Sequence, residues 1–114
     1  MTIFVKVGAT TIDVGLDLMK AAMIEDYDAF PVNDGMKEEY AKDFTITYGK
    51  KYIKIVRKGG GVMAFVVGVD NDKKFKLGDI LKPAGWAAPA RNAARGNILD
   101  GGYPINWTGP LYLN

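Results

Sequence analysis

The spacing of apolar residues changes near Phe44, and this change divides the chain into a helical part and a part made of strands. Ahead of that point, leucine and methionine recur every three or four residues, which predicts an amphipathic helix over residues 17–29. Asp17 is its expected N-cap. Pro31 is expected to end the helix, because the residue before a proline is disfavoured in helical geometry.

A second, shorter helix is predicted over residues 36–44, where apolar side chains recur at four-residue spacing. Asn33 or Asp34 is its expected N-cap, since short polar side chains accept a hydrogen bond from the first helical turn. In front of both helices, alternating apolar residues over 3–7 predict one strand.

Beyond Phe44 the apolar residues alternate with a period of two, which predicts strands over residues 45–49, 50–58, 62–70 and 74–82. Ile53 and Ile55 are expected to face the core. Three consecutive glycines at 59–61 predict a hairpin turn, because glycine tolerates positive φ. A phosphate-binding loop is the alternative, but it requires a helix start and a Lys-Ser/Thr pair after the glycines.

These elements predict an α+β fold, with an antiparallel sheet of at least three strands from residues 44–82 and the N-terminal helices packed on one face. The length of 114 residues fits a single domain, 1–114. In that domain, residues 1–43 are mostly helical. Residues 44–114 form an antiparallel meander that ends in a turn-rich basic segment.

Within the basic segment, residues 89–95 are predicted to form two helical turns, with Pro89 at the first helical position and Gly96 closing the helix. Residues 111–113 are predicted to form a final strand. Four large side chains are expected in the core: Phe65, Val67, Ile80 and Trp86.

The chain has no histidine and no cysteine, which excludes zinc sites of the Cys/His kind and Ser-His-Asp or Cys-His nucleophile systems. We therefore expect a protein that is not an enzyme and that uses no cofactor and no metal. Asp70, Asp72 and Asp79 raise calcium binding as an alternative. The segment lacks the glycine and the bidentate glutamate of a calcium loop, so a solvated turn is predicted instead.

Charge is distributed unevenly, although the net charge is only +2. Residues 1–50 carry five lysines against nine acidic residues, a net charge of −4, whereas residues 51–114 carry ten cationic against four acidic residues, a net charge of +6. Such asymmetry predicts either a basic face for an anionic partner or two halves that neutralise each other across the fold.

Cationic and aromatic residues gather in the C-terminal half, and five of them are the candidate binding residues: Lys82, Trp86, Arg91, Arg95 and Trp107. Cationic side chains neutralise phosphates, and exposed aromatic rings stack on bases. In the structural alternative, Trp86 lies in the core, the cations only solubilise the protein, and Arg95 and Asn97 brace a turn.

Residues 78–97 read GDILKPAGWAAPARNAARGN. Together with KKYIKIV and VMAFVV upstream, this segment resembles a group of small uncharacterised proteins of tailed bacteriophages that share a GDxxKxAxWxAPAxxxARGN-like segment. The resemblance covers about half of the chain. It implies a phage context, and the group brings no known activity.

Two classes of function follow from the sequence. The first is a non-catalytic interaction or accessory protein, whose partner is another protein or a second copy of the chain. The second is an accessory protein that binds nucleic acid through the basic C-terminal half. No stretch of 18 uninterrupted apolar residues occurs, so no membrane span is expected. We expect the protein in the cytoplasm, that of the host cell if it is encoded by a phage.

Overall fold

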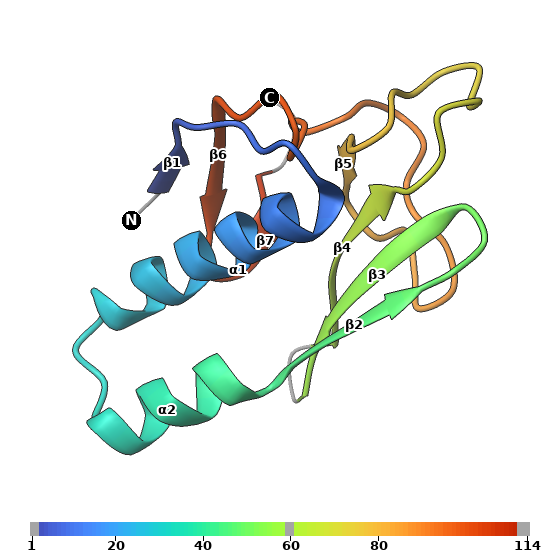
Figure 1. The fold of residues 1–114 in the computed structure, drawn as a ribbon. Helices are drawn as coiled ribbons and strands as arrows, with labels where there is room; N and C mark the ends of the chain where they lie inside the picture. The colour runs from blue at the N-terminus through green and yellow to red at the C-terminus, as the bar shows by residue number, and fades with distance from the viewer. Residues whose placement is uncertain (1–2, 59–60, 112–114) are drawn as a thin grey trace.

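A computed structural model describes residues 3–58 and 61–111 of the chain. Two helices and seven strands follow one another in these residues (Figure 1). In chain order they are β1 (Ile3–Val5), α1 (Ile12–Asp28), α2 (Asp34–Lys42), β2 (Phe44–Tyr48), β3 (Tyr52–Arg57), β4 (Gly61–Val67), β5 (Ile80–Leu81), β6 (Tyr103–Asn106) and β7 (Gly109–Pro110).

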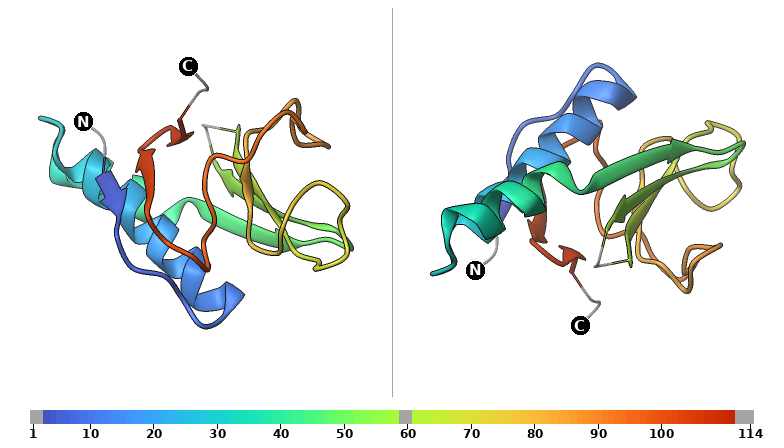
Figure 2. Two further views of the ribbon diagram at one scale, coloured as in Figure 1. Left: turned by 90° about the horizontal axis from the view of Figure 1, so that it is seen from above. Right: turned by 90° about the horizontal axis from the view of Figure 1, so that it is seen from below.

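The strands form two antiparallel sheets, one with the order β1-β6-β7 and one with the order β2-β3-β4-β5. The four-stranded sheet is the predicted meander, and the predicted α+β class is confirmed. The buried side of α1 packs against both sheets, and Figure 2 shows the strands of the four-stranded sheet reaching beyond the helices. The chain ends pair with one another, because β1 near the N-terminus lies beside β6 near the C-terminus.

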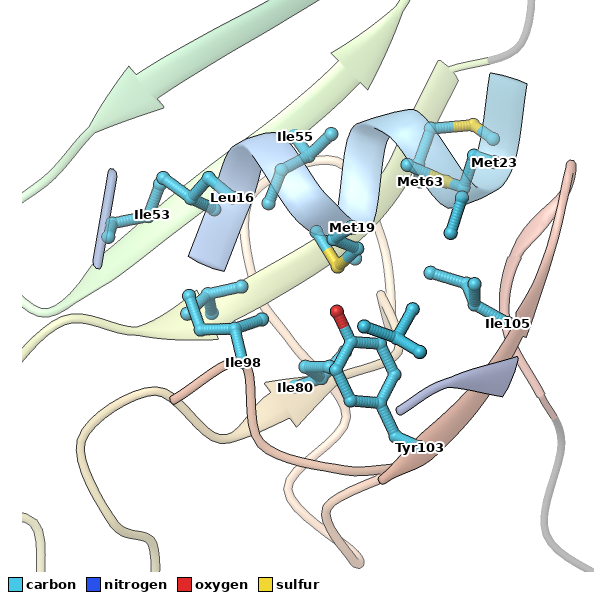
Figure 3. Packing of buried hydrophobic residues seen from close by; sticks show 14 of the residues in the cluster. Leu16, Met19, Met23, Ile53, Ile55, Met63, Ile80, Ile98, Tyr103 and Ile105 are labelled. Atoms are coloured by element: carbon cyan, nitrogen blue, oxygen red, sulfur yellow. The ribbon is translucent and has the colours of Figure 1, made fainter. Parts of the chain in front are cut away.

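The main core lies where α1 meets both sheets. Leu16, Met19 and Met23 are at most 1% exposed and supply the buried side of the helix. Figure 3 shows them beside the isoleucines of β3 and the side chain of Tyr103. Ile53 and Ile55 belong to this core, which confirms the predicted inner face of β3.

Helix α1 begins five residues earlier than predicted. Its N-cap is Thr11, whose hydroxyl oxygen accepts a hydrogen bond from the N–H of Val14 at 3.2 Å, and Asp17 lies inside the helix. Gly15 sits in the first turns of the helix, and its lack of a side chain lets the helix approach Ile98 closely. The predicted end before Pro31 is confirmed, since α1 stops at Asp28.

Helix α2 begins at the predicted N-cap Asn33, whose side-chain oxygen accepts the N–H of Met36 at 2.8 Å. Tyr40 is its buried residue, and its ring stacks on that of Tyr27 from α1 with 4.2 Å between the centroids. This aromatic contact joins the two helices. Met36 is 44% exposed, so the apolar side of α2 is narrower than predicted.

A second, smaller core lies on the face of the four-stranded sheet that is turned away from α1. Its buried residues are Phe65, Val67, Phe75 and Leu81. The predicted core positions of Phe65, Val67 and Ile80 are confirmed. The predicted core position of Trp86 is wrong, because this side chain is 65% exposed.

Residues 89–95 are not helical, which contradicts the predicted two turns of helix. The segment is extended and pairs with β5: the N–H of Arg95 donates to the carbonyl of Ile80 at 2.7 Å, and the N–H of Ile80 donates to the carbonyl of Gly96 at 2.8 Å. Pairing with a buried strand outweighs the local helix signal. Arg91 and Arg95 therefore do not share a helical face.

Two further predicted strands differ from the structure in their residue ranges. The strand predicted over residues 74–82 is reduced to Ile80–Leu81, and Leu111 does not belong to a strand. The turn predicted at residues 59–61 joins two antiparallel strands, with Gly61 at a φ of 79°, while Gly59, Gly60 and residues 112–113 lie outside the described residues.

We predict that Gly15→Ala destabilises the protein although alanine is the better helix former by about 1 kcal/mol. The new Cβ would lie 2.9 Å from the carbonyl oxygen of Ile98 and 3.0 Å from its Cβ. We expect a net loss of about 1–3 kcal/mol in the free energy of unfolding, measured by denaturant titration. Gly35→Ala, at an exposed position of α2, is the matched control and should raise stability. A stabilised Gly15→Ala variant would contradict the close packing.

We predict that Tyr103→Phe leaves the protein as stable as before or more stable, by up to about 1 kcal/mol. The Tyr103 hydroxyl is buried and has no hydrogen-bond partner among the described residues, and burial raises the pKa of Tyr103 to about 12. Figure 3 shows its oxygen pointing toward Met19. Thermal and urea unfolding measure the change. A loss larger than about 1 kcal/mol would show that the hydroxyl has a partner.

A basic aromatic surface as the candidate functional site

The face of the four-stranded sheet opposite α1 changes from apolar to polar toward β2. Thr47, Lys54, Phe65 and Leu81 lie in one row across the four strands, because each is paired directly with the next. Side chains paired in this way lie on the same face. Phe65 and Leu81 are buried beneath the segment after β4, whereas Thr47 is exposed and Lys54 is half-buried.

A narrow loop presents Trp86 above this polar end of the face. Pro83 and Pro89 form an isolated bridge, and the N–H of Ala84 donates to the carbonyl of Ala88 at 3.0 Å, so the loop is closed at its base. Trp86 lies at the tip and is 65% exposed. The ammonium of Lys54 lies 3.6 Å from the centroid of its indole ring.

Two more lysines surround the same place. A depression of about 230 Å³ is lined by Thr47, Gly49, Lys50, Lys51, Tyr52, Lys54, Phe65 and Ala87. We call Lys50, Lys51, Lys54 and Trp86 the Lys–Trp face. It combines an open aromatic ring with three ammonium groups beside a hollow.

Arg91 is held by an ion pair beside the Lys–Trp face. Its guanidinium binds both carboxylate oxygens of Asp72, at 3.0 and 3.1 Å, and also contacts the hydroxyl of Tyr52. Lys51 lies 2.9 Å from the same carboxylate. The hydrogen bonds from Arg91 and Lys51, followed by those from the N–H groups of Lys74 and Phe75, hold the pKa of Asp72 well below its usual range. Arg91 thus ties its loop to the sheet.

Arg95 lies in the segment that pairs with β5, Lys82 directly follows β5, and both residues are half-buried. The Nε and Nη1 atoms of Arg95 are buried and have no hydrogen-bond partner among residues 3–58 and 61–111. Burial, followed by the nearby charge of Arg95, lowers the pKa of Lys82. These two cations therefore lie close together and partly out of solvent.

The turn that follows Arg95 is braced by Asn97, as the structural alternative proposed. The side-chain NH₂ of Asn97 donates to the carbonyl of Leu77 and to Asp79, both at 2.9 Å. Its side-chain oxygen accepts from the N–H groups of Leu99 and Asp100 at 2.8 and 3.0 Å. Asn97, the asparagine of the ARGN part of the motif, therefore has a structural role.

Trp107 lies apart from the other four candidate residues. Its ring packs edge-on against Tyr27, Phe30 and Tyr40, and its backbone N–H donates to Asp26 at 2.8 Å. The hydroxyl of Tyr40 donates to the carbonyl of Trp107 at 2.6 Å. Trp107 therefore belongs to the aromatic contact between the two helices and β6.

Lys50, Lys51 and Lys54 are not among the residues that the sequence predicted for the site. The signal for Lys54 was present, because it alternates with Ile53 and Ile55 and so points to the other face of β3. Trp86 also carried a signal, since it stands among alanines and glycine between two prolines, without an apolar repeat around it. That pattern is typical of a loop tip.

No group of three or more His, Cys, Asp or Glu side chains that could hold a metal ion occurs in the described parts of the chain. Asp72, one of the calcium candidates, is occupied by Lys51 and Arg91. Neither helix in these parts has the length and the apolar character needed to cross a membrane.

Comparison with known proteins places the chain in one family. Residues 6–112 match the family of unknown function DUF7717, and the chain belongs to this family. No curated protein and no solved structure matches the chain. The family carries no assigned activity.

We predict that Asp72→Asn lowers stability at neutral pH and that its difference from the wild type shrinks in acid. The pKa of Asp72 is lowered in the folded state, so the unfolded chain binds the proton first. This carboxylate therefore stabilises the fold above the unfolded pKa of about 4, and the contribution is lost as the pH falls through the folded pKa. Urea unfolding at pH 7 and pH 3 measures both differences. A constant difference would contradict the role of the charge.

Proposed function

We propose that the protein is a non-catalytic binding protein and that its Lys–Trp face binds single-stranded nucleic acid. One observation carries the proposal: Trp86, the most exposed large apolar side chain among the described residues, stands on a closed loop with the ammonium of Lys54 behind its ring. An aromatic platform next to cations is how sequence-tolerant single-strand binders hold bases and phosphates.

The charges on this face favour a polyanion over an apolar partner. Lys50 is exposed and has no ion pair among the described residues, while Lys51 is 47% exposed in spite of its contact with Asp72. The depression between them and Lys54 is wide enough, at about 230 Å³, to receive a phosphate or a sugar edge. A hydrophobic protein partner would have to bury these ammonium groups without counter-charges, which is costly.

The site differs from the one expected from the sequence. Trp86 is kept, and the phosphate contacts are reassigned to Lys50, Lys51 and Lys54. Arg91 supports the site indirectly, because its ion pair with Asp72 fixes the loop on the sheet.

We predict that a labelled oligo(dT) binds the protein at low salt and that binding weakens as salt is added. A plot of log Kd against the logarithm of the salt concentration should have a slope of about 2. Three phosphate contacts at about 0.7 each give this slope. Fluorescence anisotropy measures binding, and quenching of Trp86 gives a second readout. Lys50→Ala combined with Lys54→Ala should flatten the slope by about 1.4.

Trp86→Ala should weaken binding by about 1–3 kcal/mol while leaving the salt slope unchanged, because it removes stacking and no charge. Lys37→Ala is the matched control, since Lys37 lines a separate depression with acidic residues of α1 and α2. It should bind as the wild type does. Binding that is absent at low salt would refute the proposal, as would an equal loss in the Lys37→Ala control.

A further inference from the structure

The two edges of the four-stranded sheet differ in whether another segment of the chain pairs with them. At the β5 edge, the N–H of Arg95 donates to Ile80, the N–H of Ile80 donates to Gly96, and the N–H of Ala90 donates to Lys82, at 2.7–2.8 Å. That edge is covered by the chain itself. At the other edge lies β2, and no described segment runs along its outer side in Figures 1 and 2.

The outward backbone groups of β2 follow from its pairing with β3. The N–H of Lys58 donates to the carbonyl of Asp43 at 3.1 Å, and the N–H of Gly49 donates to that of Tyr52 at 3.0 Å. Bonded and non-bonded pairs alternate in an antiparallel ladder, so the odd-numbered residues of β2 bond to β3. The N–H and C=O groups of Phe44, Ile46 and Tyr48 therefore point away from the sheet.

Strand β2 carries none of the features that usually protect such an edge. Its five residues, FTITY, include no charge, no proline and no glycine, and its register with β3 has no bulge. Natural proteins block exposed edges with lysine, proline, bulges or short strands. The edge strands of the other sheet are shorter, with three residues in β1 and two in β7.

We propose that β2 pairs with β2 of a second copy of this chain, antiparallel and centred on Ile46, to form a continuous eight-stranded sheet. Only outward-pointing residues can bond across the edge, so the centre at Ile46 uses all three of them: Ile46 faces itself, and Phe44 faces Tyr48 of the second copy. A shift by two residues loses one such pair. The self-complementary pattern thus selects one register.

The side chains fit the same register. Thr45 would lie opposite Thr47 of the second copy, and paired threonines stabilise neighbouring strands. On the other face, two aromatic rings, Phe44 and Tyr48, would meet across the interface. The exposed acidic residues Glu38 and Glu39 near the end of α2 would come alongside the turn of the second copy that carries Lys50.

This arrangement goes beyond the proposed function. A two-fold axis perpendicular to the sheet puts both Lys–Trp faces on the same side. The two β3 strands would be three strand spacings apart, about 15 Å. One surface would then carry two Trp86 platforms.

Sedimentation velocity without nucleic acid, over concentrations from micromolar to several hundred micromolar, tests the proposal. We expect a species of twice the 12.4 kDa chain mass. Thr45→Lys with Thr47→Lys places like charges opposite each other and should weaken the dimer at least tenfold. Thr45→Glu with Thr47→Lys is the matched control, because it places opposite charges there and should keep the dimer.

Three outcomes would overturn the proposal: a wild type that stays monomeric, a dimer unaffected by the two lysines, or a control that dissociates equally. Hydrogen exchange is measured on the wild type, so this second test does not depend on whether the variants fold. The amides of Phe44, Ile46 and Tyr48 should exchange at least tenfold more slowly in concentrated than in dilute samples. Equal exchange rates in a dimeric sample would show that another surface forms the interface.

Discussion

The extended pairing of residues 90–97 with β5 is the interaction on which the rest of the described structure depends. Its hydrogen bonds at Ile80 draw the segment after β5 back along the sheet, so that Ala94 packs over the second core. The same pairing closes one edge of the sheet. It also fixes the base of the loop that raises Trp86, since Ala90 bonds to the carbonyl of Lys82.

The ion pair between Arg91 and Asp72 completes this arrangement. Asp72 lies in the turn after β4, and its side chain is only 1% exposed although it is charged. A buried carboxylate is tolerated where cations and N–H groups surround it. Here Arg91, Lys51 and two backbone N–H groups do so. The loop after β4, the loop after β5 and the start of β3 are thereby held at one point, beside the Lys–Trp face.

Much of the fold could be predicted from the sequence, because the spacing of apolar residues within a segment indicates whether it forms a helix or a strand. Spacing alone predicts a helix over residues 36–44, which the structure has two residues earlier as α2. It also predicts the alternation of Ile53 and Ile55 and the apolar run of β4. The start of α1 was missed because Thr11 and Gly15 interrupt the apolar repeat, and only the contact with Ile98 explains the glycine. The extended segment 89–95 could not be predicted, since its conformation is set by a strand nearby in space and not by its own residues.

The candidate site, like the fold, could be predicted from the sequence only in part. The composition of the C-terminal half indicated Trp86 and the excess of positive charge. The spacing of residues 82–95 could not indicate that Asp72, 19 residues away, neutralises Arg91. Nor could it show that Lys54 of β3 would lie beneath the indole. The Lys–Trp face, assembled from the turn between β2 and β3, from β3 and from the distant loop of Trp86, is visible only once the strand register is known. That register also leaves the outer side of β2 uncovered, so the sheet geometry that builds the Lys–Trp face is the same geometry that allows a second copy to extend it.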